Sequence, residues 1–175
     1  MTYSQSEHAH RFAAWAAARA ASTKTARFKV SMARHWIELI PDLSDCKFGV
    51  GSLPRADRFD EAHRCWRAKL IASAQNDGVT ISHGTAAKLI NVYLKALFLT
   101  DVSSETSQVK VVHPPIDRLL IDELARERPD IWRGHPRSWS KFDSDLYERT
   151  IEKVRETLEP QSGLWRIEAH WSGFQ

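Results

Sequence analysis

Residues 80–117 read TISHGTAAKLINVYLKALFLTDVSSETSQVKVVHPPID, and they predict two helix starts joined by a polar loop. The first helix follows a polar turn at His83-Gly84 and is apolar almost all round, which is typical of a helix buried in a domain core. The second helix opens at Pro114-Pro115-Ile116-Asp117, where the aspartate is a favourable N-cap. The apolar side chains of the first helix are Leu89, Ile90, Tyr93, Leu94, Leu97 and Phe98.

One narrow stripe of this apolar helix is polar. Lys88, Asn91 and Lys95 follow i, i+3, i+7 spacing and share one face. A lysine near the start of a buried helix lies against the helix dipole and beside low-dielectric protein. Both effects disfavour the charged ammonium, so we expect the pKa of Lys88 to be lowered, as a nucleophile requires near neutral pH. The alternative is a lysine whose stem packs on the helix while its charge reaches solvent.

Every periodic signal in the rest of the chain is helical, so the predicted fold class is all-α. The first helix, at about 4–21, is expected to bury Phe12 and Trp15. The long helix near the C-terminus is expected to start at Ser138 or Ser140 and to run to residue 159, where Pro160 ends it. Further helices are expected at about 26–40, 57–75, 117–126 and 163–171, with loops at 41–57 and 102–112.

The composition is that of a globular protein. The 175 residues form one domain or two small lobes, and an apolar content of 42% supports a real core. Seven tryptophans either pack the core and the lobe contact or line a pocket for a flat ring. Cys46 and Cys65 suggest neither a disulfide framework nor a metal site, so we expect no metal and no cofactor. Without a leader or a membrane-length apolar run, the chain is expected to be cytoplasmic.

The distribution of charge is more informative than the net charge of +3. Residues 8–37 contain six lysines and arginines and no acid. A cluster of this kind either follows a phosphate backbone or is a solvated helix face. The basic residues are Arg11, Arg19, Lys24, Arg27, Lys29 and Arg34.

The run from Gly84 to Lys88, followed by Pro114-Pro115-Ile116-Asp117, resembles the helix-hairpin-helix (HhH-GPD) DNA glycosylases. It is most similar to the archaeal 8-oxoguanine branch and to compact bacterial antiviral glycosylases. In that branch a lysine opens the helix after the hairpin, and an aspartate follows about thirty residues later. Here the separation is 29 residues (117 − 88). The usual hairpin has two glycines around a hydrophobic residue, whereas this turn has Gly84 alone.

The resemblance implies a single domain over residues 1–175, with two helical lobes around a DNA- and base-binding cleft. The loop at 41–57 is expected to cross between the lobes. Lys88 would form a Schiff base with C1′ of the sugar, and Asp117 would take a proton and stabilise the cationic sugar. The alternative for Asp117 is an ordinary N-cap, and one carboxylate can fill both roles.

Contacts to DNA are expected at two places. The amides at the helix mouth can bind a phosphate without a basic side chain, and they belong to Ser82, His83, Gly84 and Thr85. A flipped base is expected to meet residues of the long C-terminal helix and the residues beside Lys88, although core packing explains the aromatic ones equally well. The candidate base-contacting residues are Asn91, His113, Trp139, Asp143 and Tyr147.

The expected partner is double-stranded DNA that contains a modified base, bound by a monomer. The leading substrate is a hypermodified cytosine of phage DNA, removed in antiviral defence, and the next is 8-oxoguanine, removed in base excision repair. Two alternatives remain open. One is a non-catalytic helical module that binds DNA or regulates, and the other is an adaptor whose tryptophans form a protein-binding surface.

Overall fold

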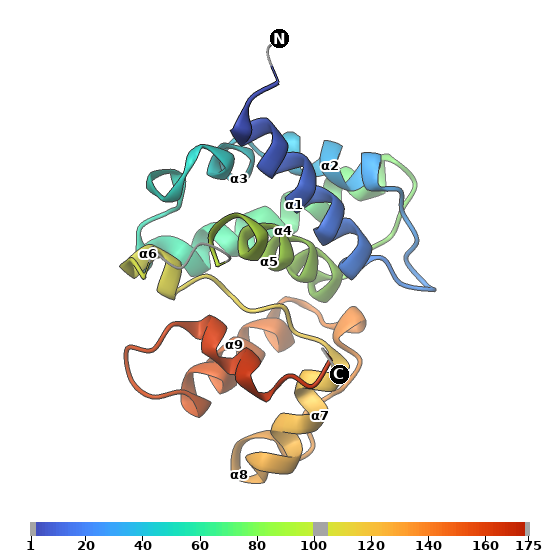
Figure 1. The fold of residues 1–175 in the computed structure, drawn as a ribbon. Helices are drawn as coiled ribbons and strands as arrows, with labels where there is room; N and C mark the ends of the chain where they lie inside the picture. The colour runs from blue at the N-terminus through green and yellow to red at the C-terminus, as the bar shows by residue number, and fades with distance from the viewer. Residues whose placement is uncertain (1–2, 100–104, 174–175) are drawn as a thin grey trace.

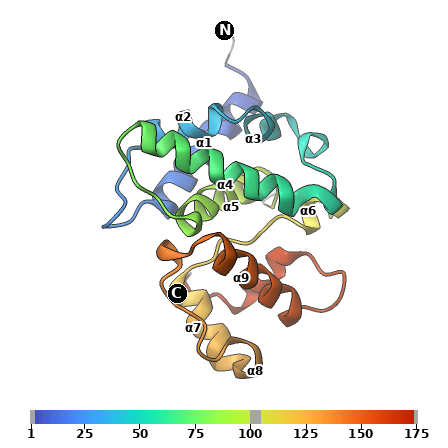
Figure 2. The ribbon, with the colours of Figure 1, turned by 180° about the vertical axis from the view of Figure 1, so that it is seen from behind.

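The computed structural model describes residues 3–99 and 105–173. Within these ranges the secondary structure is helical, with no strand, and this confirms the all-α prediction. Two hydrophobic cores divide the chain (Figures 1 and 2). We call the parts that surround them the upper lobe, up to Val112, and the lower lobe, from Ile116 onward.

The upper lobe surrounds the larger core. Helices α4 and α5 are separated by a turn at Asp77-Gly78, and α1 packs across α5. Short helices connect α2 to α4. The elements are α1 Gln5–Ala21, α2 Val30–Glu38, α3 Pro41–Ser44, η1 Asp45–Phe48, η2 Val50–Ser52, η3 Ala56–Arg58, α4 Phe59–Asn76, α5 His83–Phe98 and α6 Ser107–Lys110.

The lower lobe packs beneath α5, and Ala87 of α5 belongs to its core. Amphipathic α7 and α9 supply half of the buried side chains of this core, and the last turn of the chain closes over them. The elements are α7 Arg118–Glu127, α8 Pro129–Trp132, η4 Trp139–Lys141, α9 Ser144–Thr157 and η5 Leu164–His170.

The chain crosses between the lobes at residues 113–116 and not at 41–57. The 41–57 segment contributes Leu43, Cys46 and Leu53 to the upper core, so the crossover expected there is wrong. Pro41 occupies the first turn of α3, and the segment continues as short helices that keep it against the upper lobe. The glycines and prolines of this stretch mark turns between short helices of the same lobe.

The first helix has the predicted bounds, but the face that it buries is the opposite of the predicted one. Phe12 and Trp15 were expected to be buried, yet they are 56% and 50% exposed. The buried face of α1 consists of five alanines and His10, and the small alanine side chains allow its backbone to approach α5 closely. Both faces are apolar in sequence, so periodicity alone could not separate them. The buried alanines are Ala13, Ala14, Ala17, Ala18 and Ala21.

Side-chain caps explain where the principal helices begin. The Ser82 hydroxyl accepts a hydrogen bond from the Thr85 amide at 3.0 Å, and the Asp117 carboxylate accepts one from Leu120 at 3.0 Å. These caps start α5 and α7 where the sequence predicts them.

The start of α9 differs from the prediction. Asp143 accepts a hydrogen bond from the Leu146 amide at 2.8 Å, so the helix begins at Ser144 and not at Ser138 or Ser140. Trp139 lies in the separate turn η4. Trp139 therefore does not lie on the long helix, where it had been expected with Asp143 and Tyr147. In the expected loop at 102–112, residues 107–110 form the helical turn α6, and 102–104 lie outside the described residues.

Candidate active site at the lobe interface

Lys88 and Asp117 meet where the two lobes join. The Lys88 Nζ lies 3.0 Å from Asp117 Oδ2, and the two side chains are 8% and 21% exposed. Lys88 comes from the second turn of α5 in the upper lobe, and Asp117 is the N-cap of α7 in the lower lobe. Two ionisable groups distant in sequence thus form a pair that is largely removed from solvent.

Two tryptophans of the lower lobe surround this ion pair. The Nζ of Lys88 lies 5.3 Å from the centre of the Trp139 ring, within the range of a cation–π interaction. The indole N–H of Trp171 donates to Asp117 Oδ2 at 3.2 Å. Because Asp117 Oδ1 caps α7, both carboxylate oxygens are held in place.

A cavity of about 220 Å³ opens beside the pair. Its walls come from α1, α5, the crossing segment and the C-terminal turn. Lys95 and Glu168 form a second ion pair in it. Glu168 and Trp171 could not be predicted from sequence, since nothing in their local pattern indicates that the last turn returns to α5. The lining residues are Ala20, Lys88, Val92, Lys95, Pro115, Asp117, Glu168 and Trp171.

Burial controls the charge state of the lysine. Desolvation lowers the pKa of Lys88, while the neighbouring carboxylate of Asp117 opposes part of that shift. The direction agrees with the prediction from sequence. A buried amine with a lowered pKa beside a fixed carboxylate can lose its proton to a partner in reach, which is the first requirement of a nucleophile.

Two backbone amides at the N-terminus of α5 already have hydrogen-bond partners within the protein. The Gly84 amide donates to the Phe142 carbonyl at 3.1 Å, and the Thr85 amide donates to Ser82. These two amides are therefore unavailable to a phosphate, contrary to the prediction for the Ser82–Thr85 stretch. Gly84 is needed for a different reason: a Cβ at this position would overlap the carbonyl oxygen of Trp139.

Three of the predicted base contacts lie in a buried polar network instead. The Asn91 side chain donates to the Pro114 carbonyl at 2.8 Å and to the Tyr147 hydroxyl at 3.0 Å, and it accepts from His63 at 2.8 Å. The Tyr147 hydroxyl is in turn 3.1 Å from His113 Nδ1. Asn91, His113 and Tyr147 are each about 1% exposed. This geometry favours a framework role: Asn91 fixes the backbone three residues before Asp117.

The remaining two candidates differ from each other. Asp143 is exposed and caps α9, so its carboxylate serves the helix start. Trp139 is half-buried and is the only one of the five with a recorded contact to the Lys88 side chain. The structure thus brings Trp139 to the ion pair, but none of the five candidates lies in the cavity lining.

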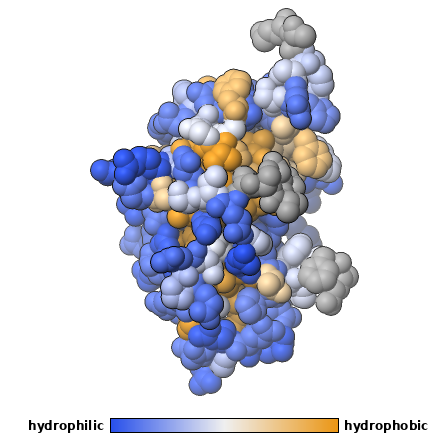
Figure 3. Space-filling model, turned by 60° about the vertical axis from the view of Figure 1, so that its left-hand side comes forward, coloured by the Kyte–Doolittle hydropathy of each residue, from blue (hydrophilic) through white to orange (hydrophobic). Residues whose placement is uncertain are grey.

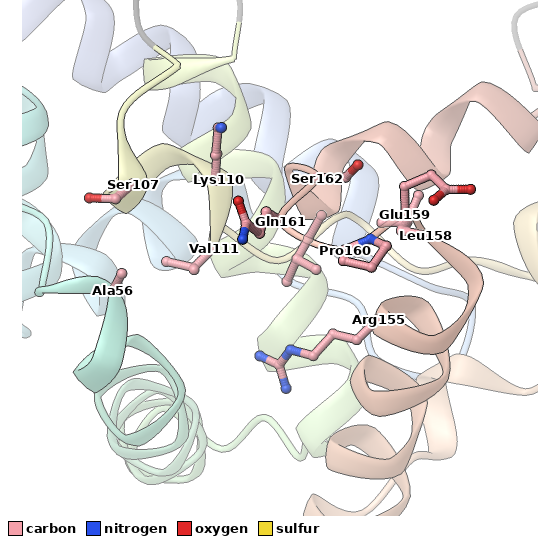
Figure 4. A pocket seen from close by; sticks show the side chains of 11 residues that line it. Ala56, Ser107, Lys110, Val111, Arg155, Leu158, Glu159, Pro160, Gln161 and Ser162 are labelled. Atoms are coloured by element: carbon pink, nitrogen blue, oxygen red, sulfur yellow. The ribbon is translucent and has the colours of Figure 1, made fainter.

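A larger cavity, of about 440 Å³, lies between α6 and the end of α9 (Figure 4). It shares no lining residue with the Lys88 cavity. Figure 4 shows Arg155 extending from α9, and its guanidinium is bound by both oxygens of Asp60 at 2.8 Å. Because this cavity offers no desolvated lysine, the smaller cavity is the better candidate for covalent chemistry.

Acid is expected to destabilise the fold through the buried histidines. Burial lowers the pKa of His63 well below its ordinary value and also lowers the pKa of His113. Below the ordinary histidine pKa of about 6.5, the folded state binds fewer protons than the unfolded chain. The free energy of unfolding should therefore fall as the pH decreases from about 6.5, because stability rises with pH wherever the unfolded state binds more protons.

Urea denaturation at a series of pH values between about 7 and 4 measures this loss. His63→Gln should make the pH dependence shallower, because one titrating group is removed. His8→Gln, at an exposed position, is the matched control and should leave the dependence unchanged. A free energy of unfolding that stays constant over this range would contradict the assignment of neutral buried imidazoles.

No family model, curated protein or solved structure matches the chain. Among the described residues, no group of three or more histidine, cysteine, aspartate or glutamate side chains is arranged to hold a metal ion. None of the helices in residues 3–99 and 105–173 has the length and apolar character to span a membrane. The candidate site is therefore defined by its own geometry.

Proposed function

We propose that the protein is a DNA glycosylase with lyase activity, in which Lys88 is the nucleophile and Asp117 its carboxylate partner. The observation that supports this proposal is the pairing of Lys88 Nζ with Asp117 Oδ2 at 3.0 Å, beside a cavity at the lobe interface. A desolvated lysine next to a fixed carboxylate suits attack on an electron-poor carbon.

The proposed reaction begins when Asp117 accepts a proton from the Lys88 ammonium. The amine lone pair then forms a bond to C1′ of the deoxyribose. The electrons of the C1′–N glycosidic bond leave with the base, which takes the proton back from Asp117. The restored carboxylate then moves one proton from the attached nitrogen to O4′, the C1′–O4′ bond breaks toward that oxygen, and the nitrogen lone pair forms the C=N bond of the protonated Schiff base. In its ionised form Asp117 stabilises the positive charge on the sugar and on this imine, and its contribution is large because the site is shielded from water.

The architecture supports the same proposal. In an HhH-GPD-like arrangement, the His83-Gly84 stretch that opens α5 would belong to the hairpin, and the two lobes would flank the cleft for double-stranded DNA. The lysine follows the hairpin and the aspartate caps the next long helix, as in the resembling family. We propose that the DNA backbone is held by basic side chains of the upper lobe, since the Gly84 and Thr85 amides are already paired.

The size of the cavity bears on the substrate. At about 220 Å³ it is smaller than the roughly 300–1,000 Å³ of pockets for drug-sized ligands. A bare oxidised base such as 8-oxoguanine is a better match to this volume than a glucosylated cytosine, which carries an additional sugar. We therefore place 8-oxoguanine before the hypermodified cytosine, and this reverses the order suggested by sequence.

Borohydride trapping tests the proposal. The wild-type protein is incubated with duplexes that carry 8-oxoguanine, glucosylated hydroxymethylcytosine or an abasic site, and borohydride reduces any Schiff base to a stable covalent adduct. We expect an adduct on the abasic duplex and on at least one modified duplex. The absence of an adduct on all three would contradict the lysine mechanism.

A second function is favoured by one observation. Asp117 caps α7 through Oδ1 and pairs with Lys88 through Oδ2, so the pair also fastens the lower lobe to the upper one. In a non-catalytic DNA-binding module this fastening would be its only role. That function predicts DNA binding without trapped adduct and without release of any base.

A further inference from the structure

The outer face of α1 presents an aromatic pair that core packing does not explain. Phe12 and Trp15 lie one turn apart with ring centroids 6.0 Å from each other, and both are about half exposed. The opposite face of the helix is the one packed on α5. Scattered exposed apolar residues are common, but two large aromatic rings in contact form a surface suited to stacking.

Positively charged side chains follow these rings along the chain. Arg19 follows Trp15 by four residues and shares its helix face, and Lys24, Arg27 and Lys29 lie in the segment after α1. These four side chains are exposed, and none of them forms an ion pair within the described residues. The sequence has no acid between His8 and Ile37 that could neutralise them.

The same helix leads to the cavity. Ala20, near the end of α1, lines the space beside Lys88 and Asp117. Eight residues of helix separate Phe12 from Ala20, which corresponds to about 12 Å at 1.5 Å per residue. In Figure 1, α1 crosses the front of the upper lobe and its end lies above the C-terminal segment. A strand lying along this face would therefore reach the cavity.

Figure 3 shows the surface of another side of the molecule. Apolar side chains reach the surface mainly over the upper lobe, and hydrophilic side chains cover most of the rest. The exposed apolar residues outside α1 include Leu39, Phe48 and Leu119. Leu39 and Leu119 stand outside the basic stretch of α1 and the segment after it, so they provide matched controls.

We propose that the outer face of α1, defined as Phe12, Trp15 and Arg19 together with Lys24, Arg27 and Lys29, binds an unpaired stretch of DNA. The rings stack on bases, which every base permits, and the cations contact phosphates. This proposal rests on the proposed function for the reaction itself. It adds that the preferred substrate has unpaired DNA next to the target base.

Fluorescence anisotropy with labelled oligo(dT) and with a duplex of equal length tests this surface. Wild type should bind oligo(dT) more tightly than the duplex. Phe12→Ser combined with Trp15→Ser should weaken oligo(dT) binding about tenfold or more, since base stacking is sequence-tolerant and strong. Leu39→Ser combined with Leu119→Ser, which removes equally exposed apolar groups elsewhere, should bind like wild type.

Salt dependence tests the cations separately. Replacing Arg19, Lys24 and Arg27 by glutamine should reduce the slope of log K against log salt by about 2, at roughly 0.7 per phosphate contact on a single strand. At saturating protein concentration the aromatic double variant should still give the borohydride adduct on an abasic duplex, so failure of the surface and failure of the chemistry are distinguishable. The proposal is overturned if the aromatic double variant retains wild-type affinity, or if wild type binds anionic vesicles but not oligo(dT).

Discussion

Lys88→Gln is expected to abolish the covalent adduct on an abasic duplex and to lower base release at least ~10³-fold, because the amide cannot supply an amine lone pair. Glutamine is close to lysine in length, and because it is neutral it introduces no new charge at this buried position. Asp117 retains its hydrogen bonds to the Trp171 indole and to the Leu120 amide. The fold should therefore survive, and circular dichroism and thermal denaturation would verify that it does.

Lys95→Gln is the matched control for this experiment. Lys95 lines the same cavity, but its side chain is more exposed and pairs with Glu168 instead of Asp117. We expect Lys95→Gln to retain the adduct. Equal loss in both variants would mean that the cavity needs two positive charges, and an unchanged adduct in Lys88→Gln would assign the nucleophile to another amine.

Gly84→Ala should destabilise the protein by about 3 kcal/mol or more, at the upper end of the cost of overpacking. An added Cβ would overlap the Trp139 carbonyl oxygen and lie 2.9 Å from its carbon and 3.1 Å from Phe142 Cβ. The obstacle is mainly backbone, which cannot move aside as a flexible side chain can. Helix propensity predicts the opposite sign, since alanine is favoured over glycine by up to about 1 kcal/mol in a helix interior.

Urea denaturation measures this effect, with Gly51→Ala as the control. Gly51 has no atom within 4 Å of an added Cβ and no left-handed backbone conformation, so its replacement should leave stability nearly unchanged or slightly raised. If Gly84→Ala proves as stable as wild type, then η4 does not pack on the start of α5. The contact of the Trp139 ring with Lys88 at the candidate site would then be wrong as well.

Local chemistry explains the parts of the fold that could be predicted from sequence. The start of α7 followed from Asp117, whose short polar side chain accepts a hydrogen bond from the first turn of the helix, whereas Ser82, which caps α5 in the same way, was expected only among the phosphate contacts. The meeting of Lys88 and Asp117 followed from a family resemblance, because spacing along the chain only nominates such a pair. Their contact at 3.0 Å agrees with that expectation.

The wrong predictions share a physical cause, which is that tertiary packing chose between locally equivalent options. On α1, alanines and aromatics both qualify as apolar, and close approach to α5 selected the alanines. Ser138, Ser140 and Asp143 are all good N-caps, and contact of η4 with α5 left Asp143 as the start of α9. Glu168 and Trp171 reach the cavity through the packing of the last turn, which no local pattern encodes.

The two oxygens of the Asp117 carboxylate have different partners, and this restricts the residues that the position can accept during evolution. One oxygen maintains the first turn of α7 and the other faces the lysine, so a longer glutamate would move both at once. Asparagine preserves the helix start but removes the negative charge. Under the proposed function, an asparagine here would therefore leave an intact fold without the carboxylate that the reaction needs.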